Sequence, residues 1–191
     1  MKAGVRALGV AESYRTQTST LAGAVVRADR VVDDFVFGTC TVGGTDATDA
    51  VSTLFDRLDR PDVQYIFVAG IAPAWFNIVD IASLAAHADR PVVAVGFEHS
   101  DGLEGPLREH FDGKALRQRL ERYRGLPPRH RISVDGNDLF VRAVGVDFAE
   151  AAEIIRGFVP ASGGRPEPLR VARLGARAGR AFYLDERNTE G

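Results

Sequence analysis

The chain has 191 residues, enough for one domain with a substantial core, and its 45% hydrophobic and 26% charged residues are ordinary for a globular protein. A single cysteine, Cys40, excludes an internal disulfide, and no apolar run approaches the ~20 residues of a membrane span. Gly4 and Arg6 interrupt any apolar segment of a secretory signal near the start. We therefore expect a cytoplasmic protein without membrane contact.

Residues 4–13 (GVRALGVAES) are predicted to form a central strand, because small or apolar side chains face both sides when the segment is read with a period of two. Glu12 continues the face of Leu8 and Val10, where burying a carboxylate is costly unless something positive meets it. A bound metal, a basic side chain, or bulk water at an early strand end would each satisfy Glu12. Of these three alternatives, only a bound metal would indicate an enzyme.

The next segments complete a recognisable order of elements. Residues 21–27 and 31–42 are predicted to form two strands of an antiparallel meander. A helix is expected after Asp46, followed by a buried strand at 63–69, a helix over 75–88 and a buried strand at 91–97. This order is that of the ribonuclease-H-like fold, an α/β mixed sheet of three antiparallel and then parallel strands, with helices on both faces.

The second half is predicted in less detail. A polar segment at 102–113 precedes a helix over 114–123, a strand over 139–146, a helix over 148–157, a loop over 162–168, a helix over 169–182 and a frayed tail over 184–191. We expect a single domain, 1–191, with an acidic half (1–112, balance −7) and a basic half (113–191, balance +5). Such asymmetry indicates a polyanionic partner, with a cation site in the acidic half.

Arginine is concentrated in two segments of the basic half. Residues 114–131 hold seven basic side chains against Glu121 alone, and Arg122 and Arg124 are among them. In the last helix, one stripe recurs at spacings of 3, 4 and 3, and it consists of Arg170, Arg173, Arg177 and Arg180. Such a stripe commonly just faces water. Two of them, with an acidic first half, favour contact with a nucleic-acid backbone, of DNA or alternatively RNA.

Two carboxylates are predicted to meet at one end of the sheet. Glu12 ends the first strand and Asp46 begins the first helix, and in a ribonuclease-H-like sheet these places are adjacent. Paired carboxylates can hold Mg²⁺, or alternatively Mn²⁺, for phosphodiester hydrolysis. The alternatives are a solvated strand end for Glu12 and a helix N-cap for Asp46. Their joint placement favours the metal site.

Three further residues and one turn are candidates. Asn77 and Asp80 share a face near the start of the second predicted helix. Asp80 either completes the site or is simply an acid that the helix dipole favours at this position. Glu98 follows the last buried strand, as a further ligand, a general base or the start of an exposed loop. The turn 43–44 (Gly-Gly) either cradles a phosphate or is a plain turn.

The chain resembles an archaeal family of deoxyuridine endonucleases, formerly a domain of unknown function, which are relatives of endonuclease V. The resemblance rests on VRALGVAES (5–13), LAGAVVR (21–27), VFGTCTVGGTDAT (36–48), WFNIVDI (75–81) and RPEPLRVARLGAR (165–177). It implies a ribonuclease-H-like fold, Mg²⁺-dependent cleavage of DNA near a deaminated base such as uracil or hypoxanthine, and a role in DNA repair.

By analogy with endonuclease V, the acid of the first strand falls on Glu12, or on position 11, which is Ala, and the acid entering the first helix falls on Asp46. The third acid falls near Ala69, which cannot bind a metal, so Asp80 or Glu98 would substitute. The segment TVGGTDAT has no counterpart of the proline-bracketed wedge with which endonuclease V opens its lesion.

The leading hypothesis is a metal-dependent endodeoxyribonuclease. Glu12 and Asp46 hold the metal, Asp80 completes the site, and Asn77 and Glu98 are additional candidates. The nucleic-acid backbone is held by Arg170, Arg173, Arg177, Arg122 and Arg124. One alternative is a non-catalytic nucleic-acid-binding protein on the same fold. Another is a nucleotide-binding or phosphatase-like enzyme that uses the turn 43–44.

Overall fold

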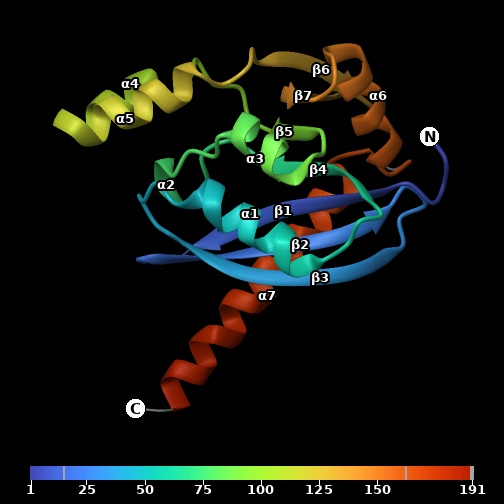
Figure 1. The fold of residues 1–191 in the computed structure, drawn as a ribbon, viewed down its shortest axis with the longest axis horizontal. Coiled ribbons are helices and arrows are strands. Elements are labelled where there is room, and N and C mark those ends of the chain that lie inside the picture. The colour runs from blue at the N-terminus through green and yellow to red at the C-terminus, as the bar shows by residue number, and fades with distance from the viewer. Residues whose placement is uncertain (15, 162, 190–191) are drawn as a thin grey trace.

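A seven-stranded sheet lies at the centre of the molecule, in the order β3-β2-β1-β4-β5-β7-β6 (Figure 1). The computed structural model describes residues 1–14, 16–161 and 163–189, with side chains up to residue 182. The strands are β1 (Arg6–Tyr14), β2 (Thr18–Arg27), β3 (Val32–Thr41), β4 (Val63–Ala69), β5 (Val92–Gly96), β6 (His130–Val134) and β7 (Asn137–Val144). The helices are α1 (Ala47–Leu58), α2 (Pro73–Phe76), α3 (Ile81–Ala88), α4 (Glu104–His110), α5 (Gly113–Arg124), α6 (Phe148–Phe158) and α7 (Glu167–Thr189).

The strand directions confirm the predicted ribonuclease-H-like order. Strands β1, β2 and β3 form an antiparallel meander, and β4 and β5 continue the sheet parallel to β1. Strand β7 then pairs antiparallel with β5, and β6 with β7. Because β1, β4 and β5 are parallel, their carboxyl ends lie at one edge of the sheet. Glu12 and Ala69 therefore reach the same edge.

Helices cover both faces of the sheet (Figure 1). Leu8 and Val10 of β1 belong to the core shared with α1 and α3, whereas Ala7 and Ala11 face the opposite side, which α6 and α7 cover. A side chain at Gly9 would collide with the backbone of Pro168, so only glycine lets the start of α7 approach β1 this closely. In the part of the chain that is described, no helix is long and apolar enough to cross a membrane.

Two predicted helices end at different places in the structure. The helix expected over 75–88 is two helices, α2 and α3, because residues 74–76 have positive φ and Asp80 begins a new helix. The frayed tail expected over 184–191 is also wrong, since α7 continues to Thr189; residues 190–191 lie outside the described residues.

Two short elements were not predicted. Helix α4 lies in the segment 102–113, where Gly105 and Pro106 interrupt any helical pattern in the sequence. Strand β6 has five residues and pairs only with β7, at the edge of the sheet. Neither carries a strong periodic signal, and both are stabilised by neighbouring elements.

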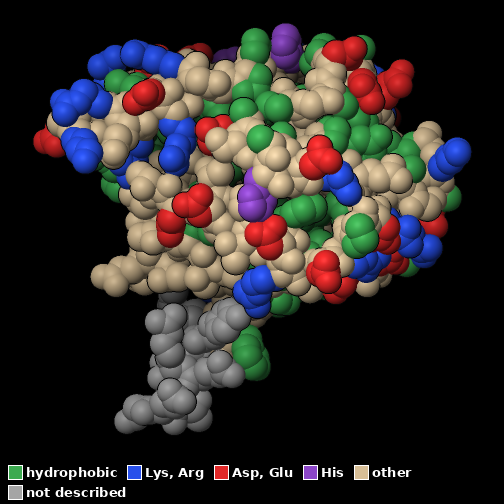
Figure 2. Space-filling model, in the orientation of Figure 1, with side chains coloured by type: hydrophobic (Ala, Val, Ile, Leu, Met, Phe, Trp, Pro, Cys, Tyr) green, Lys and Arg blue, Asp and Glu red, His purple; other side chains and the backbone are tan. Residues whose placement is uncertain are grey.

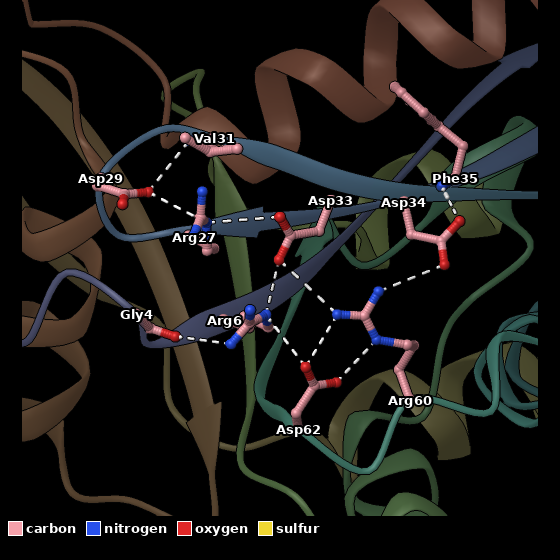
Figure 3. A network of polar contacts seen from close by, with 10 residues as sticks. All are labelled: Gly4, Arg6, Arg27, Asp29, Val31, Asp33, Asp34, Phe35, Arg60 and Asp62. Atoms are coloured by element: carbon pink, nitrogen blue, oxygen red, sulfur yellow. Dashed lines mark hydrogen bonds and ion pairs between the residues drawn. The ribbon is translucent and has the colours of Figure 1, made fainter.

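A network of ion pairs ties the amino end of β1 to β3 and to the turn before β4 (Figure 3). The Asp33 carboxylate lies 2.7 Å from Arg6 Nε, 3.4 Å from Arg27 Nε and 3.7 Å from Arg60 Nη2. Its side chain is 17% exposed, so the charges that it balances are partly shielded from water. This network closes the end of the sheet opposite to Glu12.

The variant Asp33→Asn is expected to lower the free energy of unfolding in urea by about 1–3 kcal/mol, because three guanidinium groups would lose their common carboxylate. Asp34→Asn is the matched control: that side chain is 44% exposed and pairs with Arg60 at 3.5 Å. Its loss should stay within about 0.5 kcal/mol. Equal losses in the two variants would contradict the idea that partial shielding strengthens the ion pairs of Asp33.

Candidate active site

A cleft of about 840 Å³ opens at the carboxyl ends of β1, β4 and β5. Two acidic side chains, Glu12 and Glu98, line it together with four basic ones, which are Arg165, Arg173, Arg177 and Arg180. The acids come from the ends of two strands, and the arginines come from α7 and the loop before it. Carboxylates that suit a cation therefore face guanidinium groups that suit phosphates.

Glu12 is half-buried on the face of β1 that carries Leu8 and Val10, as predicted. The hydroxyl of Ser19, a fully buried residue of β2, donates a hydrogen bond to Oε2 of Glu12 at 2.5 Å. Strand β1 continues to Tyr14, so Glu12 does not mark an early strand end. Because this bond comes from a neutral hydroxyl, it orients the carboxylate without cancelling its charge.

Asp46 occupies the N-cap position of α1, but its side chain does not bond the first N–H groups of that helix. Instead it accepts the Thr41 hydroxyl at 2.9 Å, the Thr41 backbone N–H at 3.1 Å and the Asn77 amide at 2.6 Å. Burial acts to raise the pKa of Asp46, but the hydrogen bonds from Asn77 and Thr41 outweigh it and hold the pKa below its usual value. Asp46 is thus an oriented, ionised carboxylate.

Asn77 holds this arrangement together. Its side chain is fully buried. Its amide oxygen accepts the Ala47 N–H at 2.9 Å and so caps α1 in place of Asp46, while its nitrogen donates to the Thr41 carbonyl and to Asp46. The predicted candidate Asn77 therefore lies beside Asp46, as a group that positions it.

Glu12 and Asp46 act on the same buried thiol. Burial, then Asp46 and then Glu12 raise the pKa of Cys40 to about 12. Both carboxylates therefore lie within electrostatic range of Cys40, and of the two only Glu12 is among the residues that line the cleft. No group of three or more His, Cys, Asp or Glu among the described residues could hold a metal ion. Mg²⁺, however, is commonly held by one or two carboxylates, with waters and substrate phosphates completing its shell, and this donor set fits that chemistry.

The structure does not bring Asp80 into the cleft of Glu12. Its carboxylate caps α3, accepting the N–H groups of Ala82 and Ser83 at 3.0 Å and the Ser83 hydroxyl at 2.8 Å. It lines a separate hollow beside Arg122. Of the two substitutes that the sequence offered for the third acid, Glu98 rather than Asp80 shares the cleft.

The capping contacts of Asp80 lead to a stability prediction. Asp80→Ala should lower the free energy of unfolding by about 1 kcal/mol, because two N–H groups of α3 lose their acceptor. Asp80→Asn should leave it nearly unchanged, since Asn caps as well as Asp. Thermal unfolding followed by circular dichroism measures both variants. If Asp80→Asn were as unstable as Asp80→Ala, the charge rather than the cap would be what matters.

The predicted arginines divide between the cleft and other surfaces. Arg173 and Arg177 line the cleft. Arg170 instead pairs with Glu167 at 2.6 Å, Arg122 donates to the Thr45 and Ile78 carbonyls, and Arg124 pairs with Glu104 at 2.7 Å. The prediction missed Arg165, whose guanidinium lies 3.8 Å above the Phe97 ring, because this residue precedes the helical stripe that carried the signal.

The turn 43–44 does not form a phosphate cradle. The Gly43 N–H donates to the Ala74 carbonyl at 2.7 Å, and the Gly44 N–H donates to the Thr41 carbonyl at 3.1 Å. Arg119 binds both glycine carbonyls. Since both N–H groups already have acceptors within the protein, the turn offers none to an anion.

Several known proteins are similar to this chain. The family model for endonuclease dU matches residues 3–179. A UPF0215 protein of Pyrobaculum aerophilum is 35% identical over 181 residues, which cover 92% of this chain and 94% of that protein. A UPF0215 protein of Thermococcus kodakarensis is 32% identical, over 85% of this chain and 82% of that protein.

Solved structures show the same fold. A protein of unknown function from Archaeoglobus fulgidus superposes with a TM-score of 0.82 at 26% identity, covering 91% of this chain and 97% of that one. Endonuclease V of Ciona intestinalis, in complex with DNA containing an inosine, superposes with a TM-score of 0.60 at 14% identity, covering 94% and 87%. Endonuclease V of Bacillus subtilis gives 0.61 at 15% identity, covering 95% and 82%. The chain therefore belongs to the endonuclease dU family and has the ribonuclease-H-like fold.

Proposed function

We propose that this protein is a divalent-metal-dependent endonuclease that cleaves DNA at or next to a deaminated base, uracil or hypoxanthine, in DNA repair. The observation that carries the proposal is the cleft that joins Glu12 to four arginines at the carboxyl ends of the parallel strands. The family description and the likeness to an endonuclease V solved with inosine-containing DNA support the substrate class.

Glu12 and Asp46 are the proposed metal ligands, for Mg²⁺ or Mn²⁺, with Glu98 as a further oxygen donor across the cleft. When bound, such a metal lowers the pKa of a water and stabilises the charge that develops on the phosphate. The protein keeps its ligands ready: Ser19 orients Glu12, and Asn77 and Thr41 keep Asp46 ionised. Asp80 enters this proposal only through the α3 cap.

The DNA strand is proposed to lie along the arginine side of the cleft. Arg173 and Arg177 project from successive turns of α7, and Arg165 precedes that helix. Guanidinium groups at this spacing suit neighbouring phosphates of one backbone, so contact there would be strongly salt-dependent. Arg170, Arg122 and Arg124 are engaged with other protein groups and contribute less.

A small apolar pocket of about 160 Å³ adjoins the cleft and shares Gly70 and Gly96 with it. Tyr123 and Phe140 are part of its wall, and Arg129 stacks on Phe140 at 4.0 Å. A small, partly aromatic pocket beside a cleft lined by arginines suits a base extruded from the duplex. We assign the deaminated base to this pocket.

The direct test is cleavage of end-labelled duplexes that contain one uracil, one hypoxanthine or no lesion. Nicks are expected in the two damaged duplexes with Mg²⁺ and none with EDTA. The alternative, a non-catalytic nucleic-acid-binding protein, is favoured by Ala69 at the place where endonuclease V is expected to carry its third acid, in the wall of the cleft. Tight binding of the duplexes, without cleavage in the presence of any divalent cation, would establish that alternative.

A further inference from the structure

The turn between β4 and α3 holds three consecutive residues in a conformation that side chains disfavour. Ala74, Trp75 and Phe76 have φ values of 48°, 56° and 61°. Left-handed backbone is unfavourable for residues with a Cβ atom, and such strain persists only where the surroundings impose it. Here the Gly43 N–H bonds the Ala74 carbonyl at 2.7 Å and the Asn77 N–H bonds the Pro73 carbonyl at 3.1 Å.

This turn presents Trp75 to solvent instead of burying it. The Trp75 side chain remains 44% exposed. One part of its ring rests on Gly43, where a Cβ atom would lie 2.8 Å from Cε3. The centroids of Phe111, His110 and Phe76 lie 5.2, 5.6 and 5.7 Å from that of Trp75. The ring is therefore held by Gly43 and three neighbouring rings, and the rest of it stays exposed to solvent.

Trp75 is connected to Asp46 through two neighbouring residues, Asn77 and Gly43. Asn77, two residues further on, donates to the Asp46 carboxylate at 2.6 Å, and the Gly43 turn under the ring leads directly to Asp46. A group stacked on Trp75 would therefore contact the turn whose next residue but one, Asn77, binds Asp46. The position is separate from the cleft wall on which Arg173 and Arg177 lie.

The surface next to Trp75 is basic. Helix α5 holds five basic residues and one acidic residue, but three of its arginines, Arg119, Arg122 and Arg124, bond other protein groups. Arg119 also stacks on Phe111 at 4.0 Å. Lys114 and Arg117 of this helix are exposed. Figure 2 shows Lys and Arg side chains gathered over the α4–α5 corner of the molecule. Exposed aromatic rings among cations are the combination that binds unpaired nucleic-acid strands.

We propose that Trp75 is a stacking platform for one unpaired base of the DNA strand, whose phosphates lie along α5. The inference rests on the proposed function, because that function supplies DNA as the binding partner. It assigns to the DNA a second contact with the protein, outside the arginine cleft. A stacked base would hold the strand at the turn that leads to Asn77, and because every base has a π-face, this contact is independent of sequence.

Trp75 is the only tryptophan of the chain, so its emission reports on this contact alone. The 191-residue chain in EDTA is titrated with an unlabelled thymidine oligonucleotide of about 12 nucleotides, a length that such sites span. A second oligonucleotide of equal length carries abasic positions throughout. Emission should be quenched by the thymidine strand and left unchanged by the abasic strand, which offers the same phosphates without bases.

Affinity for the labelled thymidine strand is measured by fluorescence anisotropy. Trp75→Ala is expected to weaken binding about 5- to 100-fold, and Trp75→Phe should restore most of that loss. Trp75→Leu keeps an apolar side chain on Gly43 but cannot stack, so it should bind as weakly as Trp75→Ala. The matched control is Phe35→Ala. Phe35 is 43% exposed, close to the 44% of Trp75, but it lies near the amino end of β3, whereas Gly43 under Trp75 follows the carboxyl end of that strand.

The outcomes separate this inference from the nuclease itself. Quenching without cleavage of any damaged duplex would support stacking and overturn the nuclease. Cleavage with unchanged emission and wild-type affinity of Trp75→Ala would overturn stacking alone. A shift in emission with protein concentration, before DNA is added, would place a second copy of the chain on Trp75 and overturn stacking. Failure to bind the thymidine strand would overturn stacking, while cleavage of the damaged duplexes would still decide the nuclease separately.

Discussion

Glu12→Gln is expected to lower the single-turnover rate of cleavage of a uracil-containing duplex by at least about 100-fold, because a neutral amide replaces a charged metal ligand. The Gln side chain keeps the size of Glu12 and an oxygen that accepts the Ser19 hydroxyl. Folding should therefore be unchanged, and DNA affinity measured in EDTA should stay close to that of the wild type.

Asp46→Asn should abolish cleavage in the same way but also cost stability. One oxygen of Asp46 faces the Asn77 amide and the other faces the Thr41 hydroxyl, so an Asn NH₂ group would meet a donor on one side. We expect a loss of about 1–2 kcal/mol in the free energy of unfolding. Thermal unfolding separates this structural effect from the loss of activity.

Two controls sharpen the assignment of the acids. Glu98→Gln tests the third oxygen donor and should slow cleavage less than Glu12→Gln. Glu104→Gln changes an acid that pairs with Arg124 outside the cleft, and it should leave the rate unchanged. Wild-type cleavage by Glu12→Gln would remove Glu12 from the site and contradict the proposed mechanism.

The double variant Arg173→Ala/Arg177→Ala is expected to bind DNA more weakly and with less dependence on salt. Each lost phosphate contact should reduce the slope of log K against log salt by about 0.7–0.9. Titrations over a range of salt concentrations, in EDTA, measure the slope without cleavage. Both side chains line the cleft, so a loss of two contacts is expected.

Arg170→Ala is the matched control for this experiment. Arg170 belongs to the same helix and the same arginine stripe, but its guanidinium is paired with Glu167 at 2.6 Å. Its removal should leave the salt slope of the wild type. If Arg170→Ala reduced the slope as much as the cleft variants do, the DNA would follow another face of α7.

Local patterns predicted most of the elements. The apolar run at 63–69 is β4 as observed, and the period-two pattern of the first strand correctly assigned Glu12 to the face of Leu8 and Val10. These predictions succeed because side-chain alternation along a strand depends only on neighbouring residues. The prediction of one helix over 75–88 is wrong because residues 74–76 form a left-handed turn. Contacts with Gly43 and the hydrogen bonds of Asn77 impose this turn, and neither is visible in the local sequence.

The assignment of charged residues depended more on contacts that no spacing shows. In the sequence, an arginine stripe has the same pattern whether its side chains bind a ligand or pair with residues of the same chain. The same is true of an acid at the start of a helix. Thus Arg170 and Arg173 are equivalent in the sequence pattern, yet one pairs with Glu167 and the other lines the cleft. Asp80 was predicted to complete the site and Glu98 was only an additional candidate, yet the carboxylate of Asp80 is engaged in capping α3.

The sequence by itself determined the order of the first five strands, the face on which Glu12 lies and the family to which the chain belongs, because these follow from local periodicity and shared motifs. Only the tertiary structure decided which charges meet. Gly9 lets α7 pack closely on β1, and the parallel order of β1, β4 and β5 brings distant strand ends to one edge. Both effects join residues far apart in the chain, which spacing along the sequence does not encode.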